Sequence, residues 1–379
     1  MAGHRTRLAD GRYKVVFETG VDPATGKRRR HTKLFDSYRE SGKFLHRLEE
    51  DGLRGITAHP SRLTVAEYMR SWYELRVRRR VRAKTAERYL AIIEQHVIPT
   101  MGALRLSEVT ASDVQAAVAA WMDAGLSATT VGHHYDIVRG AFGWAVDSGQ
   151  LARNPALAAT PPPRARREMV AWEPDHCRVA LEALGNSTIY LPVLMGLATG
   201  MRRGEVCALD WREVDLSKGR LRVVRTLTQT SDGLEFCDPK TAAGRREIPM
   251  PPALTSELRA IRKMQAQNKL AMRGTYADNG LVYCDPDGSP HKPDSLSGTF
   301  SNWIRRHHDR LELPVIGFHG LRHTYASLLL AAGVDLKTIA KLMGHTNVGF
   351  TLHTYAHVMR GSEEAAAEAV SAAIAGSGH

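Results

Sequence analysis

A chain of 379 residues is longer than one ordinary hydrophobic core requires, and typical domain sizes predict two or three domains. Hydrophobic residues make up 43% and charged residues 24% of the chain, a balance that excludes an intrinsically disordered protein. The formal net charge of +12 favours a polyanionic partner, although it is equally compatible with a soluble protein that is basic for other reasons.

The N-terminal segment predicts a small β-sheet followed by a helix. Residues 11–35 contain a β-branched run and a basic run separated by the turn-forming sequence DPATG, a pattern typical of two or three short strands. The stretch from Ser37 to Asp51 has a helical pattern and ends at Gly52. A basic run in this unit suits contacts with DNA phosphates, with a solvated charge run as the usual alternative. Its residues are Lys27, Arg28, Arg29, Arg30 and Lys33.

Residues 64–155 predict a bundle of four helices. Apolar residues recur at helical spacing in VAEYMRSWYEL, AERYLAIIEQHVI, DVQAAVAAWM and TVGHHYDIVRGAFGWAV, and Gly149 ends the last of these runs. The first connection is rich in cations, which suits a DNA backbone but also a plain linker. These cations are Arg76, Arg78, Arg79, Arg80, Arg82 and Lys84.

The sequence TPPPRARR, residues 160–167, predicts an interdomain linker, because its prolines stiffen the chain and cannot lie inside a helix. Helices are expected around Asp175 to Leu184 and Thr188 to Ala198. The strand-like segments GRLRVVRTL and REIPM follow, and then further helices up to Tyr355. An Ala-rich helix at residues 365–375 is marginal by itself, and it either docks on a partner subunit or packs on its own chain.

Two fragments of this last region carry charges at informative spacing. In ATGMRRGE, the Thr-Gly break places Arg202 near a helix N-terminus with Glu205 one turn later on the same side, although such a pair alone is usually an exposed helix pair. In DPKTAAGRREI, turn-forming residues between strand-like runs predict a β-hairpin with Lys240 at its mobile tip. Most hairpin lysines are simply solvated, but a lysine that delivers a proton needs such reach.

Two later fragments add histidines, a second arginine and a tyrosine. HGLRHTYAS opens an apolar helix and puts His319 and Arg322 on one face of its first turn, where the helix N-terminus favours an anion such as phosphate. Gly344 ends the next helix, LKTIAKLM, and leaves His345 on a loop. Tyr355 follows in TLHTYAHV, and alone it would be an ordinary core or surface aromatic residue.

Together these fragments resemble the active-site pattern of the tyrosine recombinase, or phage integrase, family. In chain order the matching residues are Arg202, Lys240, His319, Arg322, His345 and Tyr355. The resemblance covers essentially the whole chain, because the four-helix segment ending in ARNP resembles the family's core-type DNA-binding domain and the leading β unit its arm-type domain. Two departures concern fine tuning rather than activity: Gly320 and His353 stand where many relatives carry an acidic residue.

The resemblance implies a multidomain fold. We expect an arm-type β-sheet plus helix unit at 1–58, an all-α core-type domain at 61–158, a Pro/Arg linker at 159–168, a mainly α (α+β) catalytic domain with a small β-sheet at 169–362, and a C-terminal helix or tail at 363–379.

The same resemblance implies a nucleophile and its electrostatic support. Tyr355 would attack the phosphorus, expel the 5′ hydroxyl of DNA and form a 3′-phosphotyrosyl link that conserves the bond energy for rejoining. The transition state carries more charge on the non-bridging oxygens than the phosphodiester does. Arg202 and Arg322 would clamp those oxygens by charge-assisted hydrogen bonds.

The resemblance also implies roles in proton transfer, hydrogen bonding and orientation for the remaining residues. By resemblance, His319 is the general base for the tyrosine and Lys240 is the general acid for the leaving oxygen. His345 would donate a hydrogen bond to a phosphate oxygen, and Glu205 would orient the arginine face and the neighbouring histidine.

We expect neither a cofactor nor a metal. Phosphate-binding and dinucleotide-binding glycine motifs are missing from the sequence, and the segment DPDG at 285–288 is a turn, because Leu296 occupies the place of a calcium loop's closing glutamate. The pairs His319 with His323 and His353 with His357 lack the glutamate of H-E-x-x-H and a third ligand nearby.

The resemblance implies integration, and excision as well, of a phage or integrative element. Expected partners are double-stranded DNA attachment sites, further copies of the chain in a tetramer on DNA, and host DNA-bending and directionality factors. Two alternatives stay open. The separate arm-like domain argues against a relaxing enzyme of the type IB topoisomerase kind, and the complete set of six positions argues against a non-catalytic DNA-binding regulator.

The cysteines and apolar segments predict a cytoplasmic protein, and the resemblance implies a bacterial one that associates with the nucleoid when bound to DNA. The start MAGHRTRLADGRY lacks the apolar core of a signal peptide, and the apolar stretch from Ile189 to Ala198 is too short to cross a bilayer, so no membrane partner is expected. Four separated cysteines predict buried thiols in a reducing compartment rather than a zinc knuckle or disulfide scaffold: Cys177, Cys207, Cys237 and Cys284.

Overall fold

The computed structural model describes residues 3–21, 28–53, 63–163 and 169–345, and the single residues Gly349 and Ser371. The chain divides into two compact units, Met1–Arg166 and Arg167–His379. The expected boundaries within these units stay predictions. None of the helices in the described ranges combines the length and apolarity needed to cross a membrane.

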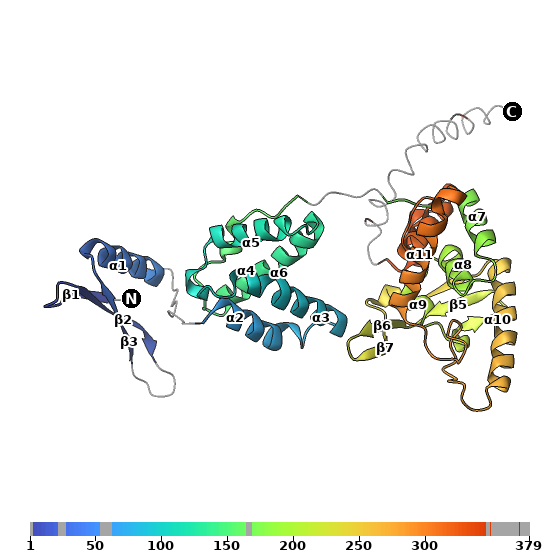
Figure 1. The fold of residues 1–379 in the computed structure, drawn as a ribbon, viewed down its shortest axis with the longest axis horizontal. Helices are drawn as coiled ribbons and strands as arrows, with labels where there is room; N and C mark the ends of the chain where they lie inside the picture. The colour runs from blue at the N-terminus through green and yellow to red at the C-terminus, as the bar shows by residue number, and fades with distance from the viewer. Residues whose placement is uncertain are drawn as a thin grey trace. The chain divides into compact units, whose positions relative to one another are not determined.

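The first unit begins with a three-stranded antiparallel sheet and one helix (Figure 1). The elements are β1 (Gly3–Arg7), β2 (Tyr13–Val21), β3 (Arg28–Phe35) and α1 (Tyr38–Leu53). Val15 and Phe17 alternate with outward residues along β2 and are buried. The two predicted strands and the helix are confirmed, but β1 was missed because GHRTR has little β-branched content, and α1 continues through Gly52 instead of ending there.

A helical bundle makes up the rest of the first unit, and its four helical segments match the predicted ones (Figure 1). Two of them contain a π-helical turn. The segments are α2 with η1 (Val65–Trp72 and Tyr73–Val77), α3 with η2 and α4 (Ala83–Ile92, Ile93–Val97 and Ile98–Met101), α5 (Ala111–Asp123) and α6 (Ala128–Asp147). Short 3-10 turns η3 (Leu106–Glu108) and η4 (Pro155–Ala158) complete the bundle.

The bundle helices begin where their capping residues predict. Thr64 accepts a hydrogen bond from the backbone N–H of Glu67, whose carboxylate accepts one from Thr64 in return, and Thr110 forms the same capping box with Asp113. Gly149, at a φ of +72°, follows the end of α6 as predicted, because glycine adopts the left-handed region without strain. These local signals fix the helix ends without tertiary contacts.

The second unit is mainly helical and holds two small sheets (Figure 1). Its helices are α7 (Pro174–Leu184), α8 (Tyr190–Thr199), α9 (Arg203–Val206), α10 (Pro252–Ala271), α11 (Pro293–Leu311), α12 (Phe318–Ala331) and α13 (Leu336–Met343). Its strands and 3-10 turns are η5 (Trp211–Glu213), β4 (Val214–Asp215), β5 (Arg220–Val223), β6 (Thr226–Thr230), β7 (Gly233–Cys237), η6 (Ala242–Gly244) and β8 (Arg246–Pro249).

The core of this unit forms around α8, which is apolar along its whole length and buried on nearly all sides. Helix α12 packs closely on α8, since a Cβ at Gly196 would lie 3.1 Å from the Leu321 side chain. At the end of α8, Gly200 has a φ of +62°, and a Cβ there would lie 2.4 Å from the Tyr325 ring. Only glycine therefore lets the chain leave α8 at this point toward Arg202.

The predicted hairpin around Lys240 is wrong. Strand β7 pairs with β6 through a two-residue turn at Ser231 and Asp232, whereas β8 pairs with β5 in the sheet ordered β4-β5-β8. Lys240 lies instead in the connection that leads from one sheet to the other. The sequence Ser-Asp-Gly, whose glycine begins β7, was the overlooked turn signal, because Gly233 adopts a positive φ of 127°.

Candidate active site

Five of the six predicted active-site residues lie in the described part of the chain, and all five belong to the second unit. They are Arg202, Lys240, His319, Arg322 and His345. Tyr355 lies outside the described residues, as do His353, His357 and Lys27.

Arg202 and Glu205 form the interaction that the sequence spacing predicted. Arg202 is the N-cap of α9, and its backbone N–H donates to Glu205 Oε2 at 2.9 Å while its Nη1 donates to Glu205 Oε1 at 2.7 Å. Glu205 is buried, whereas the side chain of Arg202 is 41% exposed. The carboxylate therefore fixes one side of a guanidinium that still reaches solvent.

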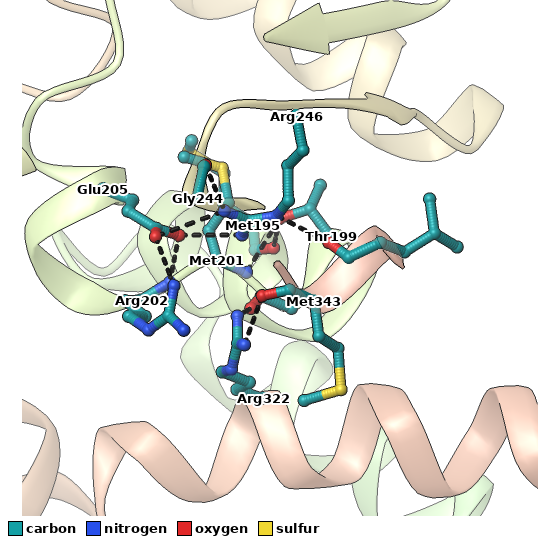
Figure 2. A network of polar contacts seen from close by, with 11 residues as sticks. Met195, Thr199, Met201, Arg202, Glu205, Gly244, Arg246, Arg322 and Met343 are labelled. Atoms are coloured by element: carbon teal, nitrogen blue, oxygen red, sulfur yellow. Dashed lines mark hydrogen bonds and ion pairs between the residues drawn. The ribbon is translucent and has the colours of Figure 1, made fainter. Parts of the chain in front are cut away.

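Arg322 has a different setting from the one its helix-terminal position suggested. Its side chain is buried, and its two terminal nitrogens donate to the backbone carbonyls of Gly200 and Met343 (Figure 2). The first carbonyl follows α8 and the second ends α13, so one guanidinium joins the ends of two helices. A guanidinium held by backbone groups has little rotational freedom left to lose on binding an anion.

Three imidazoles adjoin these arginines. His345 follows Gly344, the left-handed residue that ends α13, and its backbone N–H donates to Ala340 at 2.9 Å. Burial together with the charges of Arg322 and Arg202 lowers the pKa of His345 to about 4. Burial and the neighbouring His319 likewise lower the pKa of His323 to about 4.

His319 lies in the first turn of α12 and is exposed overall, yet the protein packed around its ring displaces water. This loss of water, with the positive charges of Arg322 and Arg202, lowers the pKa of His319. The imidazole is therefore neutral at pH 7 and able to accept a proton. Its ring lies edge-to-face with that of His323, with centroids 4.8 Å apart.

Gly320, one of the two departures in the sequence, has a steric explanation. A Cβ at this position would lie 2.7 Å from Cβ of Ile316, so the isoleucine occupies the space that a side chain would need. An acidic residue could not be placed here without moving the segment that enters α12.

Sequence reasoning missed Arg246, which lies at the centre of the polar network in Figure 2. This arginine is the first residue of β8 and donates to Glu205 Oε2 from Nη2 at 2.8 Å. Burial would raise the pKa of Glu205, but the hydrogen bonds and charge of Arg246, together with the charge of Arg202, outweigh that effect and lower it. The strand alternation contained the signal, because Arg246 is in phase with the buried Ile248.

The predicted DNA-contact residues fall in the first unit. Arg28, Arg29 and Arg30 begin β3, and Lys33 lies over the rings of Phe35 and Phe44 later in the same unit. The cations that follow η1 and extend into the first turn of α3 are all exposed, with Arg78 paired to Glu74 and Lys84 to Glu87. They are Arg78, Arg79, Arg80, Arg82 and Lys84.

The described residues contain no group of three side chains arranged to hold a metal ion. Of the four cysteines, Cys207 is buried, and Cys177, Cys237 and Cys284 are partly exposed; all four are free thiols.

Comparisons with known proteins give a consistent result. Residues 180–361 match the model of the phage integrase family, and residues 64–122 match the model of the phage integrase N-terminal SAM-like domain. A tyrosine recombinase XerC-like protein of Caldanaerobacter subterraneus is 26% identical over 82% of this chain and 83% of its own length. The ICEBs1 integrase of Bacillus subtilis is 24% identical over 93% of this chain and 95% of its own length.

Solved structures share the fold. An integrase of the Tn1549 transposon in complex with circular intermediate DNA superposes with a TM-score of 0.70 at 22% identity, covering 81% of this chain and 99% of that chain. A lambda integrase tetramer bound to a Holliday junction superposes with a TM-score of 0.57 at 16% identity, covering 90% and 92%.

Proposed function

This chain belongs to the phage integrase family of tyrosine recombinases, DNA-binding enzymes that break and rejoin DNA strands in site-specific recombination, and we propose that it does so through a 3′-phosphotyrosyl intermediate on Tyr355. The family match extends through residue 361 and so includes this tyrosine. We further propose that it integrates and excises a mobile element, since similar proteins include the ICEBs1 integrase and the transposase of transposon Tn916.

One observation carries the proposal: two arginines and two histidines from separate segments of the chain lie close enough for the arginine charges to act on both imidazoles. Burial lowers the pKa of His319 and of His345, and the positive charges of Arg322 and Arg202 lower the pKa of both imidazoles further. Positive charge concentrated in this way is costly without an anion, and a phosphodiester supplies one.

The geometry supports a metal-independent phosphoryl transfer. Arg202 and Arg322 would bind the non-bridging oxygens, whose charge grows in the transition state. Neutral His319 would take the phenolic proton of Tyr355 as the phosphorus–oxygen bond forms, and Lys240 would protonate the departing 5′ oxygen. Rejoining runs the same steps in reverse with the 5′ hydroxyl of another strand.

Strand exchange between two duplexes needs several active sites, and the lambda integrase relative has been solved as a tetramer bound to a Holliday junction. We propose that this chain also forms a tetramer on paired attachment sites in the bacterial cytoplasm. The expected host DNA-bending and directionality factors stay predictions.

The test begins with nicked duplexes from a random-sequence pool, selected by their capture in SDS-resistant adducts with the full chain. We expect adducts that form in excess EDTA and strand transfer to a second duplex of the selected sequence. Absence of any adduct would overturn the proposed chemistry. Efficient relaxation of supercoiled plasmid without the selected sequence would instead support the type IB topoisomerase alternative.

The exposed arginines between η1 and α3 give a separate prediction about DNA binding. Replacing Arg79 and Arg80 by glutamine should flatten the slope of log K against log salt by about 0.9 for each phosphate that is no longer neutralised, or about 2 for both. Binding to the selected duplex is measured across a salt series. Arg105→Gln, which removes an exposed arginine paired with Glu108 in the same unit, is the control. An unchanged slope in the double variant would show that these arginines do not contact DNA.

A further inference from the structure

Arg246 has no direct role in the proposed chemistry, yet its side chain makes several hydrogen bonds to segments that carry predicted active-site residues. Its Nε donates to the carbonyl of Leu342 at 2.6 Å, and its Nη1 donates to the carbonyl of Gly244 at 3.1 Å and to Glu205 Oε1 at 3.2 Å. Nη2 adds the 2.8 Å bond to Glu205 Oε2. The side chain is only 3% exposed, so these acceptors replace water around a fully charged group.

Each acceptor belongs to a segment that carries a predicted active-site residue. Glu205 holds Arg202 through two hydrogen bonds. Leu342 lies in the last turn of α13, which leads to His345. Gly244 ends η6, the turn that follows Lys240.

Close packing confirms that two of these segments meet at Arg246. A Cβ at Gly344 would lie 2.7 Å from the carbonyl oxygen of Ala243 and 3.1 Å from Cδ of Arg246. The end of α13 therefore lies directly against the connection that carries Lys240, with the aliphatic stem of Arg246 beside it. Figure 2 shows the Arg246 guanidinium beside Glu205 and Gly244.

We propose that Arg246 is a positioning residue for the phosphotyrosyl reaction, and that it holds Arg202, the Lys240 connection and the end of α13 in one arrangement. Its guanidinium acts on the reaction through Glu205 and the backbone, not by contact with the phosphate. The inference rests on the proposed function, because the groups it aligns are those of that chemistry. It assigns Arg246 a role separate from that of a surface cation or a general core residue.

Lysine is the informative replacement. It keeps the positive charge but offers one ammonium centre, which cannot reach two carboxylate oxygens and two carbonyls in the fork geometry of a guanidinium. In the full chain, Arg246→Lys should keep its fold by circular dichroism and its affinity for the selected duplex. Single-turnover adduct formation should fall by about 100-fold, the cost typical of a misplacement of about 1 Å among reacting groups.

Arg220→Met is the matched control. Arg220 lies on the neighbouring strand β5 and pairs with Glu247 on the exposed face of the same sheet, so its loss removes a guanidinium and an ion pair from the sheet without touching the network. Its adduct rate should equal that of the wild type. An equal loss in both variants would assign the effect to sheet stability and overturn the proposal.

The pH profile separates positioning from mere structure. With lysine at 246, Glu205 loses hydrogen bonds and its pKa rises, so the carboxylate becomes protonated and releases Arg202 as the pH falls. The adduct rate of Arg246→Lys should therefore fall more steeply than that of the wild type as the pH is lowered. The double variant Arg246→Met/Glu205→Gln has no carboxylate at position 205. Its adduct rate should be slow, but it should not show the additional fall with decreasing pH.

The results distinguish a residue that positions the reacting groups from one that only maintains the fold. Wild-type rates in folded Arg246→Lys would overturn the proposal, and so would an unfolded lysine variant, which would make Arg246 a residue that only maintains the fold. An adduct rate that recovers in the double variant together with its thermal stability would also overturn it. Failure of the wild type to form any adduct would overturn the proposed function instead.

Discussion

A chain in which Tyr355 is replaced by phenylalanine is expected to form no covalent protein–DNA adduct while it binds the selected duplex with wild-type affinity. The phenolic oxygen is the atom that would bond to phosphorus, and no other atom of the ring can replace it. Adduct formation should fall below detection, because charge stabilisation and binding alone cannot form a bond between the protein and phosphorus. The measurement is SDS-resistant retention of labelled duplex, with binding followed separately by a gel shift.

The matched control is Tyr325→Phe, which also deletes one phenolic oxygen. Tyr325 is buried in the second unit, and burial raises the pKa of its hydroxyl, so it is poorly suited to act as a nucleophile. This variant should keep its adduct. An undiminished adduct in Tyr355→Phe would show that another residue attacks the phosphorus.

Local signals in the sequence were sufficient for much of the fold and for one half of the site. Capping boxes and a left-handed glycine fix the ends of bundle helices within a few residues, so those helices could be predicted without tertiary information. The spacing of Arg202 and Glu205 likewise needs only the geometry of one helical turn. Gly344 similarly predicted the end of α13, and so predicted that His345 lies just beyond this helix.

Features that depend on long-range pairing could not be predicted in the same way. Strand β8 pairs with β5 and not with the adjacent β7, and local sequence does not choose between these partners. Arg322 was expected to face a helix terminus, but its setting depends on the carbonyls of Gly200 and Met343, which are distant in the sequence. Strand alternation could have shown that Arg246 is buried, but the reason for its burial depends on Glu205, which is distant in the sequence.

Replacing Lys240 by alanine is expected to slow adduct formation by about a hundredfold to ten-thousandfold, the usual contribution of a positioned general acid. Lys240 is exposed on the connection between β7 and η6, so its removal leaves the core intact. Thermal stability and duplex binding should therefore stay at wild-type values. The loss should appear only in the chemical step, measured as the single-turnover adduct rate.

A duplex with sulfur in place of the bridging 5′ oxygen tests the role of Lys240 directly. A thiol has a pKa of about 8.5, so a thiolate can leave without first receiving a proton. An alkoxide is much more basic and leaves slowly unless it is protonated. Lys240→Ala should regain a near wild-type rate on the sulfur duplex.

Two control variants accompany this test. Arg202→Lys should stay slow on both duplexes, because its defect lies in stabilising the phosphorane charge. Lys218→Ala, which removes an exposed lysine paired with Asp215 beside the sheet, should be normal on both. Equal slowness of Lys240→Ala on oxygen and sulfur would mean that this lysine does not protonate the leaving group, and the proton donor would then have to be sought among the histidines around Arg322.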